Sequence, residues 1–127
     1  MPVIHLDTSV LIDALTRDKL LLPPIMRILD RGDRLALSTM VLFEWLRGPR
    51  GRDDLEAQGL LFPSHEALPF EAADAEISAR IYRSVTRPRS READIAIAAC
   101  AIRHEAALWT VNAGDFADIP GLRLFQP

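Results

Sequence analysis

The sequence predicts an α/β fold, in which helices cover both faces of a central, mainly parallel sheet to form a three-layer α/β/α sandwich. Short segments that are apolar throughout alternate with longer segments in which apolar residues recur at helical spacing. Strands that are apolar throughout are buried on both faces, which is typical of parallel sheets. The chain has 127 residues, 49% of them hydrophobic, which suits one domain spanning residues 1–127.

The first half of the chain is expected to form two strands and four helices. Prolines at the start of "LPPIMRILDRG" and Gly32 at its end are typical start and stop signals of a helix. Ser38 or Thr39 can cap the helix that follows and ends at Gly48-Pro49. The predicted strands are 3–6 and 34–38, and the predicted helices are 8–17, 22–32, 40–48 and a weaker one at 52–59.

The second half begins with "LPF" at 68–70, which is either a strand remnant or a lead-in to a helix. The stretch "TRPRSR" separates an amphipathic helix from a helix rich in small residues. The turn "NAGDFADIPG", which has room for a short helical piece, separates the last two strands. The predicted helices are 71–86 and 91–105, and the predicted strands are 107–111 and 122–125.

Composition excludes several classes of protein. The net charge of −3 gives no general basic surface for nucleic acid or anionic membrane, although the basic residues are nearly all arginine. No apolar run approaches the roughly 20 residues of a membrane span, and Asp7 interrupts the N-terminal run that a signal peptide would need. A cytoplasmic protein with no membrane partner is therefore expected.

The cysteine and histidine content points away from disulfides and from zinc motifs. Cys100 is the only cysteine, which excludes an internal disulfide, and it is expected to be a small core residue. His5, His65 and His104 are scattered, and each is expected to be structural or exposed rather than a ligand.

Three polar residues follow predicted strands. Asp7 comes directly after the first strand, and Asn112 and Asp115 follow the strand "ALWTV". Asp7 can be the N-cap of the next helix, and Asn112 and Asp115 with Gly114 can be ordinary turn residues. The carboxyl ends of parallel strands also form the usual ligand-binding edge of such a sheet.

Two further carboxylates interrupt helices that are otherwise apolar. Glu44 lies in "MVLFEWLRG", in a stripe that is expected to be mostly buried, where it can pair with Arg47 three residues later. Asp94 opens "DIAIAACAI", where the helix dipole and Arg91 can stabilise it. Carboxylates that converge at one edge of a sheet repel one another, and a hard cation such as Mg²⁺ relieves that repulsion. Convergence of these acids is a hypothesis that spacing alone does not test.

Taken in order, "LDTSVLID", "STMVLFEWLRG", "READIAIAACA" and "TVNAGDFADIPGLRL" resemble the motifs of PIN domains, and specifically of VapC toxins of bacterial toxin–antitoxin pairs. The resemblance covers nearly the whole chain. It implies a Rossmann-like sandwich and an endoribonuclease that uses Mg²⁺ or Mn²⁺ and a cation-activated water to hydrolyse RNA phosphodiesters. It also implies a cognate antitoxin and a homodimer as partners. One departure is His104-Glu105, where many relatives have glycine at the end of the helix, and it affects a cap only.

The resemblance assigns roles to particular residues. The expected catalytic acids are Asp7, Glu44, Asp94 and Asp115, and the expected metal ligands are Asp7, Asp94 and Asp115, with Asn112 as the alternative to Asp115. The expected supporting residues are Thr8, Ser9, Thr110 and Asn112. The candidate RNA-binding residues are Arg80, Arg83, Arg87, Arg89 and Arg91, which can equally be a solvated helix end.

Two other functions compete with this interpretation. A phosphatase of the haloacid dehalogenase type needs a second aspartate two residues after Asp7, where this chain has Ser9. A non-catalytic, PIN-like binding module would keep the acids for structural reasons only. For a dimer, Leu20 to Leu22 and Ile25 are the exposed apolar candidates, although they can equally be core.

Overall fold

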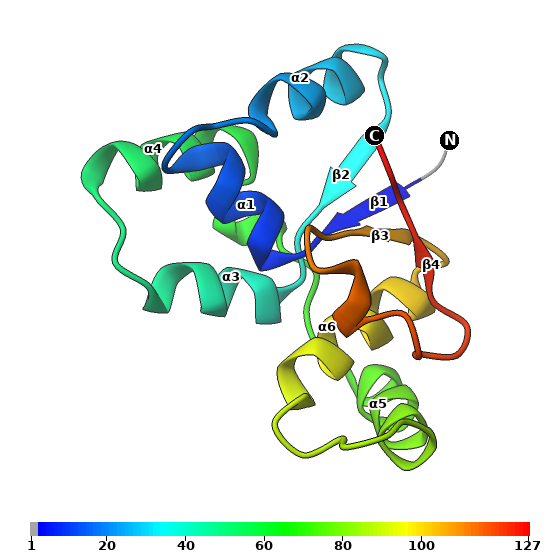
Figure 1. Ribbon diagram of the computed structural model, residues 1–127. Helices are drawn as coiled ribbons and strands as arrows, with labels where there is room; N and C mark the ends of the chain where they lie inside the picture. The colour runs from blue at the N-terminus through cyan, green and yellow to red at the C-terminus, as the bar shows by residue number, and fades with distance from the viewer. Residues whose placement is uncertain (1–2) are drawn as a thin grey trace.

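A four-stranded, fully parallel sheet lies at the centre of the computed structural model, which describes residues 3–127 (Figure 1). The strand order is β2-β1-β3-β4. The strands are β1 (Val3–Leu6), β2 (Arg34–Ala36), β3 (Ala107–Trp109) and β4 (Arg123–Leu124). The two central strands are the most buried, as their apolar sequences require, so the predicted parallel sheet is confirmed.

The strand order places a crevice beside the end of β1. The chain passes from β1 to β2 on one side and later returns to β3 on the other side of β1. Ligands bind in open parallel sheets at such a switch point, outside the carboxyl ends of the strands. The N–H of Asp7 donates to the carbonyl of Trp109 at 2.9 Å, which holds the ends of β1 and β3 together.

Six helices surround the sheet, and two short 3₁₀ helices, η1 and η2, lie in the connections. In Figure 1, α1 to α4 lie together on one side of β1, while α5 and α6 pack against each other on the other side. The three predicted layers are therefore present. The helices are α1 (Thr8–Leu15), α2 (Leu22–Asp30), α3 (Thr39–Arg47), α4 (Arg52–Leu61), α5 (Ala72–Ser84) and α6 (Glu92–Arg103), with η1 at Ser64–Glu66 and η2 at Ala113–Asp115. No helix within residues 3–127 is long and apolar enough to span a bilayer.

Differences from the predicted elements have local causes. Helix α4 continues past Gly59 to Leu61, because the buried side chain of Gln58 donates to the carbonyl of Phe62 at 2.8 Å and satisfies the helix end. Residues 68–70 contribute a single parallel bridge, between Leu68 and Ser38, instead of a strand. Strand β3 ends at Trp109 because the next residues turn toward α1, where the N–H of Val111 donates to Ser9 Oγ.

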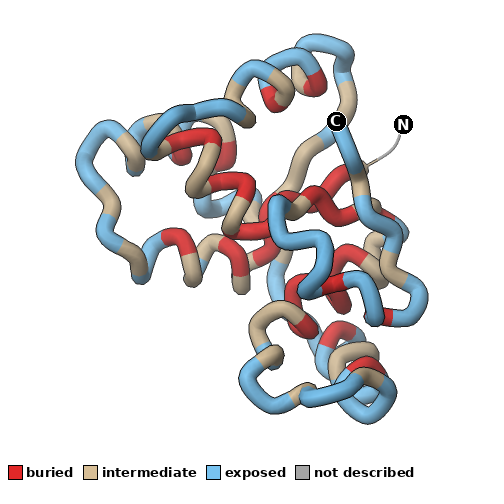
Figure 2. Tube along the Cα trace, viewed as in Figure 1, coloured by how far each residue is buried: buried red, intermediate tan, exposed pale blue. Residues whose placement is uncertain are grey.

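The core follows the alternation of β1 and the small-residue sequence of α6. Buried residues gather along β1, in α1 and over most of α6 (Figure 2). His5 points toward α6, so Ile4 and Leu6 face the opposite layer, where both are buried. Cys100 is buried, as predicted, and burial raises the pKa of its thiol to about 11. Ile25 is fully buried, so its suggested place in a dimer interface is wrong, whereas Leu20 is exposed.

A buried ion pair joins α5 to α6. Asp74, which is 0% exposed, accepts hydrogen bonds from two nitrogens of Arg103, and Arg103 Nη2 lies 3.1 Å from Asp74 Oδ2. Burial acts to raise the pKa of Asp74, but the hydrogen bonds from Arg103 and from the Glu71 N–H hold that pKa below 3.8. Asp74 and Arg103 lie far apart in the sequence, and their pairing was not predicted.

We expect Asp74→Asn to lower the free energy of unfolding by about 3 kcal/mol, because it leaves the guanidinium of Arg103 without its buried counter-charge. The measurement is urea unfolding at pH 7. The matched control is Glu71→Gln, which removes the exposed second partner of Arg103 and should cost less than about 1 kcal/mol. Because the folded pKa of Asp74 is depressed, its carboxylate stabilises the fold at pH values above its unfolded pKa. This stabilisation is lost as the pH falls through the folded pKa. Parent and variant should therefore converge in acid.

Candidate active site

A depression of about 300 Å³ lies at the carboxyl edge of the sheet, at the switch point beside β1. It gathers residues from α1, from the middle of α3, from the first turn of α6 and from the loop after β3. The lining residues are Asp7, Thr8, Ser9, Ile12, Glu44, Arg47, Asp94 and Asn112. The predicted convergence of Asp7, Glu44 and Asp94 is therefore present in the structure, together with three of the supporting residues.

Asp7 is held by side-chain hydroxyls. The residue is 5% exposed, and its Oδ2 accepts hydrogen bonds from Ser9 Oγ at 2.7 Å and from Thr110 Oγ1 at 2.8 Å. Asp7 occupies the N-cap position of α1, but its side chain makes no capping hydrogen bond to the helix. The side chain of Asp7 therefore does not act as a helix cap. Hydrogen bonds to the local backbone do not explain why this carboxylate is buried.

The two hydroxyl groups are themselves oriented by the loop after β3. Ser9 Oγ accepts from the N–H of Val111 at 3.2 Å, and Thr110 Oγ1 accepts from the N–H of Asn112 at 3.0 Å. Each oxygen can then direct its own hydrogen at Asp7. This chain of donors fixes the position of the Asp7 carboxylate relative to the ends of both central strands.

Glu44 sits on the opposite wall of the depression. Thr8 Oγ1 donates to Glu44 Oε1 at 2.7 Å, and Arg47 Nη2 lies 3.5 Å from Glu44 Oε2. The expected pair with Arg47 is thus present, but the side chain of Arg47 is 61% exposed, so this pair neutralises Glu44 only weakly. The rest of α3 is less buried than its sequence predicts, since Phe43 and Leu46 are exposed.

The pKa of Asp94 reflects both the burial and the negative charge of the site. Its pKa is raised from 3.8 to about 6, first by burial and then by the negative charges of Asp7, Glu44 and Asp115. The alternative explanation, stabilisation by Arg91, is weak. The guanidinium of Arg91 lies instead on Asp118, at 2.6 and 3.0 Å, and on the backbone carbonyls of Thr86 and Asp115.

The structure separates Asn112 from Asp115. Asn112 lines the depression with the three carboxylates, whereas Asp115 lines a neighbouring depression of about 410 Å³ with Arg87 and Arg91. The cause is η2, which begins after Asn112 and turns the chain away, with the Asp115 N–H donating to the Asn112 carbonyl at 2.9 Å. Asn112 is thus the residue of the two that lines the acidic depression, although the charge of Asp115 still acts on Asp94.

The arginine-rich stretch between residues 80 and 91 is only partly suited to RNA binding, the role expected from the sequence. Arg80, Arg83, Arg87 and Arg89 are exposed on the end of α5 and the following loop. Arg91 is half-buried and engaged by Asp118, so the expectation that it contacts RNA phosphate is not favoured. The pairing with Asp118 was missed because an aspartate in a turn, 27 residues away, carries no sequence signal.

The donor set at the depression suits a hard cation. Carboxylate, hydroxyl and amide oxygens are the groups that Mg²⁺ and Mn²⁺ prefer. Within residues 3–127, the acids do not form a group of three whose ligand atoms all lie within 4.8 Å of one another. A cation bound between them would therefore retain water ligands, as Mg²⁺ commonly does.

We expect Asp7→Asn to lower the pKa of Asp94 in the metal-free protein, because it removes a neighbouring negative charge. Carboxyl ¹³C chemical shifts followed against pH measure this. Asp13→Asn is the control and should leave the pKa of Asp94 unchanged, since Asp13 accepts the Leu21 N–H outside the depression. Because the folded pKa is the higher one, Asp94 favours the fold below pH 3.8, and this contribution is lost as the pH rises through about 6. An unchanged Asp94 pKa in Asp7→Asn would show that the two groups are not coupled.

Comparison with known proteins agrees with this architecture. The PIN domain family matches residues 4–122. The chain is similar to the crystal structure of DNA-bound VapBC from Salmonella typhimurium, with 21% identity, 98% of each chain covered and a TM-score of 0.79. It is similar to VapBC2 from Rickettsia felis bound to a promoter DNA fragment, with 21% identity, 97% of each chain covered and a TM-score of 0.76. The third similar structure is FitAcB from Neisseria gonorrhoeae, with 27% identity, coverage of 98% of this chain and 97% of that one, and a TM-score of 0.69. No curated protein matches the chain. The family match spans nearly the whole sequence, and the chain belongs to the PIN-domain family.

Proposed function

We propose that the chain is a divalent-metal-dependent endoribonuclease and the toxin of a toxin–antitoxin pair. The observation that carries this proposal is the convergence of Asp7, Glu44 and Asp94 on one depression at the switch point of a PIN-domain sheet. The similar structures include VapBC complexes, which supports an antitoxin as the protein partner.

The residues fit a hard divalent cation. Three carboxylates line the depression, and the one basic side chain among its lining residues is the largely exposed Arg47. Burial and the neighbouring negative charges raise the pKa of Asp94, and a bound cation would relieve the repulsion among the acids. Asp7 receives both hydroxyl hydrogen bonds on Oδ2, and we assign Oδ1 to the cation.

Each residue then has a distinct task. Asp7 and Asp94 would hold the cation, with the side-chain oxygen of Asn112 as a further donor. When bound, a divalent cation polarises a phosphoryl oxygen and lowers the pKa of a water molecule. Glu44, fixed by Thr8, would accept a hydrogen bond from the attacking water and orient it toward the scissile phosphodiester.

The RNA would approach over the end of α5 and the loop before α6. Arg87 lines the depression that adjoins the acidic one, and Arg80, Arg83 and Arg89 are exposed on the same segment. Contacts from these side chains to backbone phosphates would offset the negative charge of the acids. Since the chain carries a net charge of −3, binding would depend on this segment and weaken with salt.

We expect the purified chain, freed of antitoxin, to cleave RNA in Mg²⁺ or Mn²⁺ and to lose cleavage in chelator. Asp7→Asn and Asp94→Asn should each reduce the rate by roughly 10²-fold or more, because each removes a charge on which cation binding depends. The readout is single-turnover cleavage of labelled RNA, with circular dichroism to confirm folding. The same variants, expressed in cells without antitoxin, should not arrest growth, whereas the parent should.

Cleavage by Asp7→Asn at the parental rate would overturn the assignment of the site, and cleavage that persists in chelator would overturn the role of the cation. A folded parent that binds RNA but never cleaves it would support the binding-module alternative.

A subtler variant tests the hydroxyl support of Asp7. We expect Thr110→Val to lower the cleavage rate or the apparent cation affinity by roughly 10- to 100-fold, the usual effect of removing a partner that orients a ligand. Thr16→Val is the matched control, since the Thr16 hydroxyl donates to the Ile12 carbonyl within α1. Equal rates for both variants would show that Thr110 does not position Asp7.

A further inference from the structure

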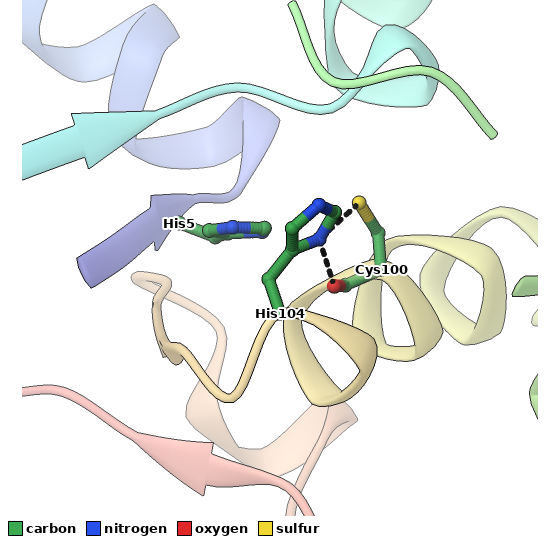
Figure 3. Close-up of side chains that lie close together, drawn as sticks. All are labelled: His5, Cys100 and His104. Carbon is green, nitrogen blue, oxygen red and sulfur yellow. Dashed lines mark hydrogen bonds between the residues drawn. The ribbon is translucent and has the colours of Figure 1, made fainter.

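A second cluster of potential ligands lies away from the acidic depression, between β1 and the last turn of α6. His5 comes from the middle of β1, Cys100 lies within α6, and His104 ends that helix four residues later. Figure 3 shows the imidazole of His5 directed at that of His104, with the Cys100 side chain beside it. One ligand atom from each residue lies within 4.8 Å of the other two.

His5 has no hydrogen-bond partner within the described part of the chain. The residue is 1% exposed, and both Nδ1 and Nε2 are buried and unpaired. A neutral imidazole has one N–H and one lone pair, and leaving both unpaired in the protein interior is unfavourable. Apolar side chains fill the neighbouring β1 positions, so an unpaired histidine here is unusual and points to a missing partner.

His104 is oriented as a metal-binding histidine would be. Its Nδ1 lies 2.9 Å from the Cys100 carbonyl oxygen and 3.6 Å from Cys100 Sγ. A hydrogen bond from Nδ1 to a backbone carbonyl fixes the tautomer and leaves the Nε2 lone pair free. His104 is only partly buried, whereas His5 and Cys100 are buried.

We propose that His5, Cys100 and His104 bind a d¹⁰ metal ion, Zn²⁺ or Cu⁺. One thiolate and two imidazoles are soft-to-borderline ligands, which select these ions over Mg²⁺. Zinc ligands at 2.0–2.3 Å from the metal lie roughly 3.5 Å from one another, so closure needs side-chain shifts of about 1 Å from the present spacing. The thiol gives up its proton to solvent when the metal–sulfur bond forms.

The ion would join β1 to α6. These two elements also carry Asp7 and Asp94, but the two sites differ in ligand chemistry and need not be occupied together. The inference does not rest on the proposed nuclease function. An ion that binds only the folded state would also stabilise it.

The test uses the full chain, stripped of metal and kept reduced. Addition of Co²⁺ as a spectroscopic probe should give a thiolate-to-cobalt charge-transfer band at one equivalent, and Zn²⁺ should displace it. Excess Mg²⁺ should leave the band unchanged. At zinc concentrations 100-fold above its Kd, Tm should rise by roughly 10 °C. A competing Cu⁺ chelator, assayed in parallel, decides which of the two ions binds more tightly.

Cys100→Ala should abolish the band, and His104→Gln should weaken zinc binding at least tenfold, both in folded protein. Two controls should bind as the parent does: His65→Gln, an exposed histidine, and Asp7→Asn, in the acidic depression. Absence of the band in the folded parent, loss of the band in excess Mg²⁺, or parental zinc affinity in Cys100→Ala would each overturn the proposal. A structure determined in the presence of zinc, in which the His5 ring is hydrogen-bonded to a buried water and not to the metal, would also overturn the proposal.

Discussion

The backbone hydrogen bond between Asp7 and Trp109 fixes the geometry on which the acidic site depends. It extends the pairing of β1 and β3 by one step beyond the sheet, so that the residues leaving the two strands stay adjacent. Thr110, next after Trp109, can therefore reach Asp7, although 103 residues separate them. The contact of Thr110 with Asp7 therefore depends on this hydrogen bond, whereas Ser9 reaches the same carboxylate from its own segment of chain.

Hydroxyl hydrogen bonds help the fold to tolerate several acids in one place. Asp7 and Glu44 each accept a hydroxyl hydrogen bond, which spreads their charge without a buried cation partner. Asp94 has no such hydroxyl partner among the described residues, and burial together with the neighbouring negative charges raises its pKa to about 6. The basic groups nearby compensate these acids only weakly, because Arg47 pairs with Glu44 from a largely exposed position and Arg91 is engaged by Asp118. Negative charge is thus concentrated at the depression, and the fold's own arginines leave it largely uncompensated.

The sequence predicts those features that local pattern determines. The apolar run of β1, the alanines of α6 and the polar residues at strand ends are contiguous signals, and they led to the parallel sheet and to Asp7, Glu44 and Asp94. The choice of Asp115 over Asn112 stays a prediction: one turn of 3₁₀ helix separates the two residues, and Asn112 is the one that lines the acidic depression. The pairs formed by Arg103 with Asp74 and by Arg91 with Asp118 join distant segments, so no spacing rule finds them. The same holds for His5, whose neighbours Cys100 and His104 lie about 100 residues away in the chain.

Helix α6 carries Asp94 in its first turn, beside the acidic depression, and His104 caps its other end, beside β1. Its 12 residues give a rod of about 18 Å, and its middle is buried on all sides, from Ile95 to Ala101. One buried helix therefore sets the spacing between a residue of the acidic depression and a residue of the histidine–cysteine cluster.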